Sequence, residues 1–258
     1  MFLEKLKKDE LWIILATMAT SGVVLFWKLL DNYIDKEGLS GLDVPVNNMM
    51  VTLRTPVISK IMLLITLTGN WQMLLWGTVL ASILLLAANK YRYFLAMVIS
   101  NVSGFIFTEG AKLIISRPRP PIANALIKEN GYAFPSGHSY FAVVFYGLIF
   151  YFWYKHFHKW PQKIAVAVGG IGFILLLAFS RIYLGVHWTT DVLAGLSSSG
   201  TWLTAVIIYL EIRNRFFANE YKEFNRKRVW TGLIIFGGLW LAGLGWFYIK
   251  TIGQFPSA

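Results

Sequence analysis

The sequence predicts an all-α protein, a polytopic membrane helix bundle with six core transmembrane helices and a seventh at the C-terminus. Hydrophobic residues make up 56% of the 258 residues and charged residues only 14%, whereas a soluble domain has roughly 25% charged residues. Apolar segments recur at about the 20-residue length that a helix needs to cross a bilayer. Because backbone groups must satisfy one another inside a membrane, these segments are expected to be helices.

Seven apolar segments are the candidate spans. In chain order they are residues 11–30, 60–88, 93–115, 136–154, 163–179, 188–210 and 229–249. The first has too long an apolar run for a cleavable signal peptide, so we expect it to stay in the mature chain. The second is longer than one crossing requires and contains Gly69 and Asn70. We therefore expect a short interfacial helix that ends there, followed by a span from Trp71.

These segments are expected to form one membrane-embedded domain over residues 1–258, with a core at 93–211 that carries the polar motifs. The connection 31–59 has apolar residues at helical intervals, which predicts an amphipathic helix on the outer interface. The apolar residues in question are Val46, Met49, Met50, Leu53 and Val57. Such a helix either borders a route for a lipid tail or is a connector that rests on the membrane.

The net charge of +11 is best interpreted through the placement of the cations. Fourteen of them fall on the side of the N-terminus: Lys5, Lys7, Lys8, Lys90, Arg92, Lys155, Lys159, Lys163, Arg213, Arg215, Lys222, Arg226, Lys227 and Arg228. The other side holds ten. Lys and Arg accumulate on the cytoplasmic side of membrane proteins, so a cytoplasmic N-terminus in a plasma membrane is predicted. The charge thus indicates a bilayer, and nucleic acid is not an expected partner.

Three short polar blocks interrupt the apolar chain, at residues 112–120, 135–138 and 180–191. Their residues, with the intervals between them, are Lys112, six residues, Arg119-Pro120; Pro135-Ser136-Gly137-His138; and Ser180-Arg181, five residues, His187, three residues, Asp191. With a cytoplasmic N-terminus, all three blocks fall on the outer face. Polar residues are costly at membrane depth, so their convergence on one face indicates a functional site.

The types of residue in these blocks indicate an anion site. His187 and Asp191 are four residues apart at the start of a helix and therefore share a face. A carboxylate there can hold one ring nitrogen and leave the other free as a nucleophile. Lys112, Arg119 and Arg181 supply the positive charge that phosphoryl transfer requires. A metal is the competing interpretation, but these cations would repel a dication, so we expect neither a metal nor another cofactor.

Ser136 and Gly137 are typical of a helix entrance. The serine can cap the helix, and the glycine lets the backbone approach a ligand closely. Free amide groups at a helix N-terminus then point toward a negatively charged group. This block, which continues into His138, is therefore expected to help to hold a phosphate.

The order, spacing and membrane placement of the three blocks resemble the signature of the type 2 phosphatidic acid phosphatase superfamily, the lipid phosphate phosphatases. All eleven specified residues agree. The resemblance implies that His187 attacks phosphorus to form a phosphohistidine, that Asp191 orients it, and that His138 protonates the leaving oxygen. It also implies the positions that hold the phosphate: Lys112, Arg119, Ser136, Gly137 and Arg181.

The implied activity is metal-independent hydrolysis of a lipid phosphate or diphosphate through a phosphohistidine, at the outer membrane face. Undecaprenyl diphosphate is the favoured substrate, and phosphatidylglycerophosphate and phosphatidic acid are further candidates. Two alternatives stay open at this point. A phosphotransferase would use the same phosphohistidine with another acceptor, and a noncatalytic lipid-binding or lipid-moving protein would not need an intact motif.

Two charged residues near the first block need separate interpretation. Glu109 lies three residues before Lys112 on the same helix face, so we expect an ion pair that fixes the lysine. Arg117-Pro118 repeats the Arg119-Pro120 pattern two residues earlier. The spacing from Lys112 favours Arg119 as the phosphate ligand, and Arg117 is expected to contact a headgroup or the loop.

Overall fold

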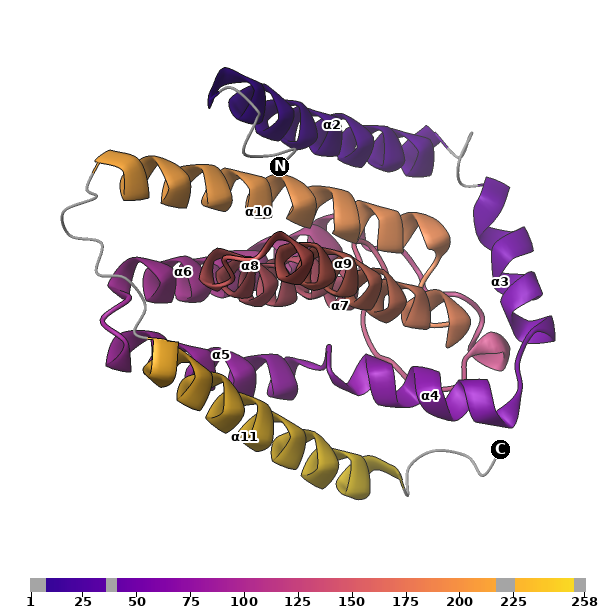
Figure 1. Ribbon diagram of the computed structural model, residues 1–258. Coiled ribbons are helices and arrows are strands. Elements are labelled where there is room, and N and C mark those ends of the chain that lie inside the picture. The colour runs from indigo at the N-terminus through magenta and orange to yellow at the C-terminus, as the bar shows by residue number, and fades with distance from the viewer. Residues whose placement is uncertain (1–7, 36–40, 217–225, 253–258) are drawn as a thin grey trace.

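The computed structural model describes residues 8–35, 41–216 and 226–252, and this part of the chain is helical without any strand (Figure 1). The elements are α2 (Lys8–Asp35), α3 (Asp43–Thr52), α4 (Pro56–Leu67), α5 (Trp71–Ala87), α6 (Tyr91–Ile115), the 3₁₀ turn η2 (Ile122–Asn124), α7 (Gly137–Phe141), the π-helical turn η3 (Ala142–Tyr146), α8 (Gly147–His156), α9 (Trp160–Tyr183), α10 (Thr189–Phe216) and α11 (Arg226–Ile252). The predicted all-α class is confirmed.

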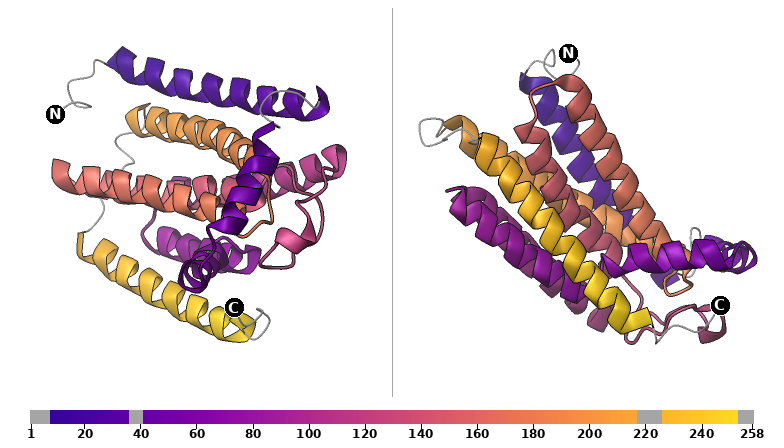
Figure 2. Two further views of the ribbon diagram at one scale, coloured as in Figure 1. Left: turned by 90° about the vertical axis from the view of Figure 1, so that its right-hand side faces the viewer. Right: turned by 60° about the horizontal axis from the view of Figure 1, so that its bottom comes forward.

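Within the described residues, three helices are long and apolar enough to cross a membrane by themselves: Tyr91–Ile115, Trp160–Tyr183 and Thr189–Asn214. The pair α4 and α5, bent by 48° at its break, passes the same test as one broken span. The long helices run roughly along one another, with α2 beside α10 and α11 beside α5 (Figures 1 and 2). The chain thus forms a membrane helix bundle. The expected number of spans, six in the core and a seventh at the C-terminus, stays a prediction.

The bundle is held by a core of interlocking aromatic rings. The Phe145 ring lies edge-on to Tyr146, with ring centroids 4.9 Å apart, and 6.2 Å from the Trp240 ring of α11. A Cβ atom at Gly77 of α5 would lie 2.6 Å from Phe145 Cζ, so only glycine lets α5 approach this closely. The predicted C-terminal helix therefore packs on the core through Trp240.

The helix break predicted at Gly69 and Asn70 is confirmed, because α4 ends at Leu67 and α5 begins at Trp71. A Cβ at Gly69 would lie 2.8 Å from His138 Cδ2 and 3.0 Å from Leu177 Cδ2. A larger residue at position 69 would therefore displace the imidazole. The break both bends the helix pair and brings its backbone against a predicted catalytic residue.

Two other predicted elements differ in detail from the structure. The segment expected at 136–154 is interrupted by η3, a π-helical turn of the kind that is frequent at functional sites. The fifth segment was expected to end at Phe179, but α9 continues to Tyr183 and contains Arg181. The polar residues do not end the helix because they find partners: Ser180 Oγ donates to the Leu177 carbonyl at 2.6 Å, and Arg181 donates to Thr66 Oγ1.

The predicted helix in the 31–59 connection exists, but its expected face is wrong. The helix α3 ends at Thr52, so Leu53 and Val57 do not continue its face. Its buried residues are Asp43, Asn47 and Met50, and two of these are polar. The buried face of α3 is partly polar because its carboxylate and amide groups have hydrogen-bond partners in the bundle. The periodicity of apolar residues does not mark such a face.

The fold brings the three polar blocks to one end of the bundle. The last turn of α6, the start of α7, the end of α9 and the start of α10 meet there, at the right-hand side of Figure 1. The helix α3 crosses this end, and the loop between α6 and α7 lies beside it (Figures 1 and 2). The opposite end carries the connections α5 to α6 and α8 to α9.

Candidate active site

The third polar block is shaped by the turn between α9 and α10. Gly185, at φ +72°, ends α9 in the left-handed conformation, and a Cβ there would lie 2.1 Å from the Asn124 carbonyl oxygen. Arg54 Nη2 donates to that same carbonyl at 2.7 Å and to the Tyr183 carbonyl at 3.0 Å. Arg54 and the Asn124 backbone therefore fix this turn, and the chain continues from it to His187 and α10.

The imidazole of His187 is buried with its two ring nitrogens facing different partners. Arg119 Nη1 lies 3.2 Å from Nε2. Arginine can only donate, so this contact requires an unprotonated Nε2 and places the proton on Nδ1. Nδ1 lies 3.5 Å from Asp191 Oδ2, without the geometry of a hydrogen bond. The free lone pair of His187 is thus on Nε2, toward the arginines.

Asp191 is fully buried and its two oxygens have different partners. Oδ2 accepts from the backbone N–H of Trp188 at 2.8 Å, which resembles a capping box at the start of α10. Oδ1 accepts from Arg117 Nη1 at 2.6 Å. These two hydrogen bonds therefore fix the Asp191 carboxylate beside His187, without a hydrogen bond to Nδ1.

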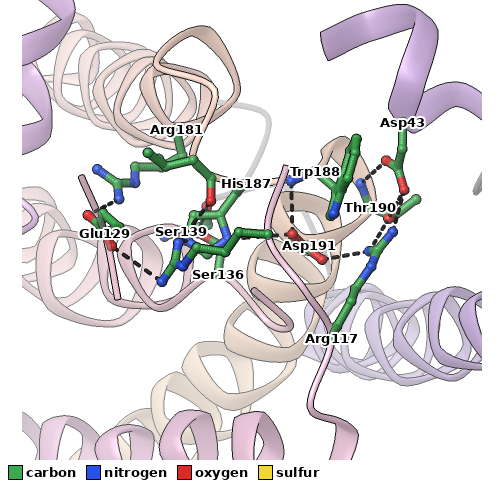
Figure 3. A network of polar contacts seen from close by, with 12 residues as sticks. Asp43, Arg117, Glu129, Ser136, Ser139, Arg181, His187, Trp188, Thr190 and Asp191 are labelled. Atoms are coloured by element: carbon green, nitrogen blue, oxygen red, sulfur yellow. Dashed lines mark hydrogen bonds and ion pairs between the residues drawn. The ribbon is translucent and has the colours of Figure 1, made fainter. Parts of the chain in front are cut away.

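Arg117 is not a headgroup or loop contact, as the sequence suggested, but a buried partner of Asp191. Arg117 is 5% exposed, and its guanidinium donates from Nη2 to Asp43 Oδ2 at 2.6 Å. Thr190 joins the same group, since its backbone N–H donates to Asp43 Oδ1 at 3.0 Å. Figure 3 shows this cluster of Asp43, Arg117, Thr190 and Asp191 on one side of His187. The expectation failed because the second carboxylate comes from α3, 74 residues earlier.

Two arginines lie on the other side of His187. Arg181 is fully buried and donates to Thr66 Oγ1. It also donates to Glu129 Oε1 (Figure 3). Arg119 donates to three backbone carbonyls, of which the Val186 carbonyl is the nearest at 2.8 Å, and its Nη2 lies 3.4 Å from Glu129 Oε2. A carboxylate that no motif contains thus sits between the two arginines.

The first and second blocks contribute a lysine and a helix start. Lys112 Nζ donates to Glu109 Oε1 at 2.6 Å, which is the ion pair expected from the sequence. A Cβ atom at Gly137 would lie 3.7 Å from Lys112 Nζ, so this glycine faces the lysine. Ser136 Oγ accepts from the Ser139 backbone N–H at 3.4 Å, so its predicted capping role is present. The Ser136 N–H donates to the Asp191 carbonyl at 3.0 Å and joins this block to α10.

His138 lies in the first turn of α7, half-buried. Its Nε2 lies 2.9 Å from Asn70 Oδ1, at the α4–α5 break. If the amide oxygen accepts from Nε2–H, the lone pair of Nδ1 is left for proton transfer. The break in the helix pair therefore supplies a group that orients the imidazole.

The electrostatic environment keeps His187 neutral. Burial lowers the pKa of the His187 imidazole well below its ordinary value of about 6.5, and the charges of Arg119 and Arg181 lower it further. Burial also lowers the pKa of Arg119, and the charge of the Glu129 carboxylate partly offsets this by raising the pKa. A neutral imidazole at physiological pH is the form that can act as a nucleophile.

We expect ¹⁵N spectra of histidine-labelled protein to show a neutral His187 at about pH 5.5, where an ordinary histidine is mostly protonated. The unfolded chain takes up this proton before the folded one does, so the histidine lowers the stability of the fold as pH falls below about 6.5. Loss of one set of signals in His187→Ala assigns the resonances. Half-titration near 6.5 in the ligand-free protein would contradict this environment.

The site contains three contributors that sequence reasoning missed. Asn70 was noted only as part of a helix break, and Asp43 only as part of a connection. Glu129 lies in the loop between the first and second blocks, and no spacing signal marks it. Arg117 was the available clue to these missing residues. A buried charge needs a partner, and Asp191 alone cannot balance several buried arginines.

Fold and site together define a helical membrane protein with a buried histidine between a carboxylate and a group of cations. A family model described as the PAP2 superfamily matches residues 89–216. Phosphatidylglycerophosphatase B of Bacillus subtilis is 32% identical over 205 residues, which are 79% of this chain and 96% of that relative. This chain belongs to the PAP2 superfamily, and the resemblance found in its sequence is confirmed.

Other known proteins are similar to the chain to different degrees. An undecaprenyl-diphosphatase of Sulfolobus acidocaldarius is 27% identical over 154 residues, 58% of this chain and 69% of that relative. The crystal structure of a transmembrane PAP2 type phosphatidylglycerolphosphate phosphatase from Bacillus subtilis superposes with a TM-score of 0.69 at 28% identity, over 77% of this chain and 98% of that one. Aquifex aeolicus LpxE, with a TM-score of 0.51 at 21% identity over 66% of this chain and 95% of that one, shares the fold.

Proposed function

We propose that this protein is a lipid phosphatase that hydrolyses a terminal phosphate or diphosphate through a phosphohistidine at His187. The observation that carries the proposal is the position of His187, whose Nε2 faces Arg119 at 3.2 Å while its Nδ1 faces Asp191 at 3.5 Å. The first contact directs a lone pair toward a place that attracts anions. The second offers a carboxylate to stabilise the positive charge that develops on the ring during attack.

In the first half-reaction, His187 Nε2 forms a bond to phosphorus while the bond from phosphorus to the leaving oxygen breaks. The proton for that oxygen comes from His138, whose ring is neutral in the ligand-free site. It takes up a second proton when the negative charges of a bound phosphate lie beside it. Lys112, Arg119 and Arg181 stabilise the negative charge on the phosphoryl oxygens. For Arg119 this means exchanging its contact with His187 for a phosphate oxygen.

In the second half-reaction, water attacks the phosphohistidine and His138 accepts the proton of that water. The bond between phosphorus and Nε2 breaks, and inorganic phosphate leaves. Asn70 keeps the ring of His138 in one orientation for both steps, through the contact of 2.9 Å. The cations supply the charge stabilisation that a metal supplies in other phosphatases, so the proposed reaction needs no metal.

The substrate is proposed to be a lipid, because the site lies at the ends of helices long and apolar enough to cross a membrane. A phosphate at this end can enter the site while its tail stays among lipids. Relatives are a phosphatidylglycerophosphatase B and an undecaprenyl-diphosphatase. We therefore propose phosphatidylglycerophosphate and undecaprenyl diphosphate as the two candidate substrates, acted on at the extracytoplasmic face. Impermeant labels on Ile122→Cys and Lys159→Cys should mark opposite sides, and labelling of Lys159→Cys from outside would reverse this orientation.

We expect purified protein to release phosphate from lipid phosphates in excess chelator. A panel of phosphatidylglycerophosphate, undecaprenyl diphosphate, phosphatidic acid and soluble glycerol 3-phosphate, compared by kcat/KM, tests both parts of the proposal. Lipid substrates should exceed the soluble ester by orders of magnitude. Equal efficiency for the soluble ester, or activity lost in chelator and restored by a metal, would contradict it.

A further inference from the structure

Glu129 is the only carboxylate among the described residues that contacts both arginines of the phosphate cradle, which we define as Lys112, Arg119 and Arg181. Its Oε1 accepts from Arg181 and its Oε2 lies 3.4 Å from Arg119 Nη2. The side chain is 23% exposed, so it reaches in from the rim of the site rather than from its floor. Figure 3 shows it beside Arg181 and on the side of His187 opposite to Asp191.

The whole segment around Glu129 is wrapped about Arg119. The guanidinium donates from Nη2 to the Asn130 carbonyl at 3.1 Å and from Nε to the Gly131 carbonyl at 3.0 Å. Together with the carboxylate, these contacts occupy Nε and Nη2 of Arg119, two donors that could bind a phosphate in a bidentate manner. In the ligand-free site the chain itself thus occupies donors of Arg119 that a phosphate would otherwise use, while Arg181 Nε has no hydrogen-bond partner among the described residues.

The charge of this carboxylate persists at neutral pH. Burial alone raises the pKa of Glu129, but the charge of Arg181, with a smaller effect of Arg119, brings the pKa well below the usual glutamate value. The three cations of the cradle therefore face two internal anions, Glu129 and the Glu109 partner of Lys112. A ligand must therefore carry more negative charge than one carboxylate does in order to displace Glu129 from the cradle.

Resting on the proposed function, we propose that Glu129 is a specificity residue, an internal competitor for the phosphate position that admits dianionic phosphomonoesters and diphosphates but not phosphodiesters. A phosphodiester carries one negative charge, as the carboxylate does, and gains little by exchange. A phosphomonoester carries about −1.5 to −2 at pH 7 and can displace it. Ordinary phospholipids of the bilayer are phosphodiesters, so this competitor keeps the site free of them.

A competitor inside the chain lowers the apparent affinity for every anion by the same factor, the fraction of time that the site is open. A monoanion binds the cations more weakly to begin with, so this factor excludes it at concentrations at which a dianion still binds. Glu129→Gln removes the charge and keeps the size of the side chain, so we expect inorganic phosphate to bind about tenfold tighter or better. Dioleoylphosphatidylmethanol, a phosphodiester lipid that is no product of a candidate substrate, should change from a poor inhibitor to an effective one, with its half-inhibiting mole fraction lowered about tenfold.

The experiment compares the full chain, Glu129→Gln, Glu129→Asp and the control Glu211→Gln in detergent micelles. Glu211 is a carboxylate of the same bundle that pairs with Lys155 at 2.8 Å near the opposite end of α10. Phosphate and phosphatidylmethanol binding are measured by calorimetry in a His187→Ala background, where no turnover occurs, and inhibition is measured with the active forms. Glu129→Asp retains the charge on a shorter side chain and should give an intermediate affinity.

Tighter binding of both probes in Glu129→Gln, with Glu211→Gln unchanged, supports the inference. Unchanged or weaker phosphate binding in a folded Glu129→Gln, or equal tightening in Glu211→Gln, overturns it. If Glu129→Gln does not fold, Glu129→Asp decides in the same way. Because binding is read without turnover, absent hydrolysis in the wild-type chain would count against the proposed function and leave this measurement decisive for Glu129.

Discussion

His187→Ala should abolish phosphate release from lipid phosphates, with kcat lowered by at least about 10⁴-fold. The variant removes the atom that forms the bond to phosphorus, and no other imidazole can take its place because His138 is held by Asn70. The side chain of His187 makes no hydrogen bond within the fold except with Arg119, so the bundle should stay intact. Gel filtration and the thermal unfolding midpoint check that it does.

The matched control is His158→Ala, an exposed histidine between α8 and α9 at the opposite end of the bundle. Its activity should equal that of the wild type within about twofold, because a surface substitution away from the site rarely costs more than about 0.5 kcal/mol. A folded His187→Ala protein that retains a tenth of wild-type kcat would remove this histidine from the mechanism.

Arg117→Met should destabilise the fold by about 3–5 kcal/mol and lower kcat strongly, although Arg117 touches no substrate. The substitution leaves two buried carboxylates, Asp43 and Asp191, whose oxygens each lie 2.6 Å from the lost guanidinium. Their repulsion should move Asp191 away from His187. The thermal unfolding midpoint in detergent measures the first effect and steady-state kinetics the second.

A double-mutant cycle with Asp43→Asn separates positioning from general damage. Asp43→Asn removes one of the two uncompensated charges, so Arg117→Met with Asp43→Asn should be more stable than Arg117→Met alone. Arg117→Lys keeps a cation without the two-pronged geometry and should recover stability more than kcat. A change in KM with kcat unaffected would indicate that Arg117 binds substrate and does not position Asp191.

The sequence predicted most helices from patterns within single segments, and it predicted the meeting of the three polar blocks from the alternation of the spans across the bilayer. Long apolar stretches define α6 and α10, and the glycine at position 69 marks the break before α5. The four-residue interval from His187 to Asp191 correctly indicated that the two side chains lie close together, but the shared helix face was wrong, because α10 begins at Thr189 and His187 precedes it. These features are local, and the bilayer allows few alternatives to a helix.

The contacts that complete the site could not be derived in this way because they join segments far apart in the chain. Asp43 reaches Arg117 across 74 residues, and Asn70 reaches His138 across 68. Glu129 lies in a loop whose path depends on carbonyl contacts with Arg119 rather than on any periodicity. Loop paths and buried polar partners depend on the assembled bundle.

Rapid chemical quench of the wild-type protein, with a lipid substrate labelled in its terminal phosphate, tests directly whether a phosphohistidine forms at His187. We expect a protein-bound phosphate that is stable in alkali and labile in acid, as a phosphoramidate is, and we expect peptide mass spectrometry to place it on His187. The label should be absent from His187→Ala. Phosphate on another residue, or full turnover with no bound phosphate at any quench time, would contradict this mechanism.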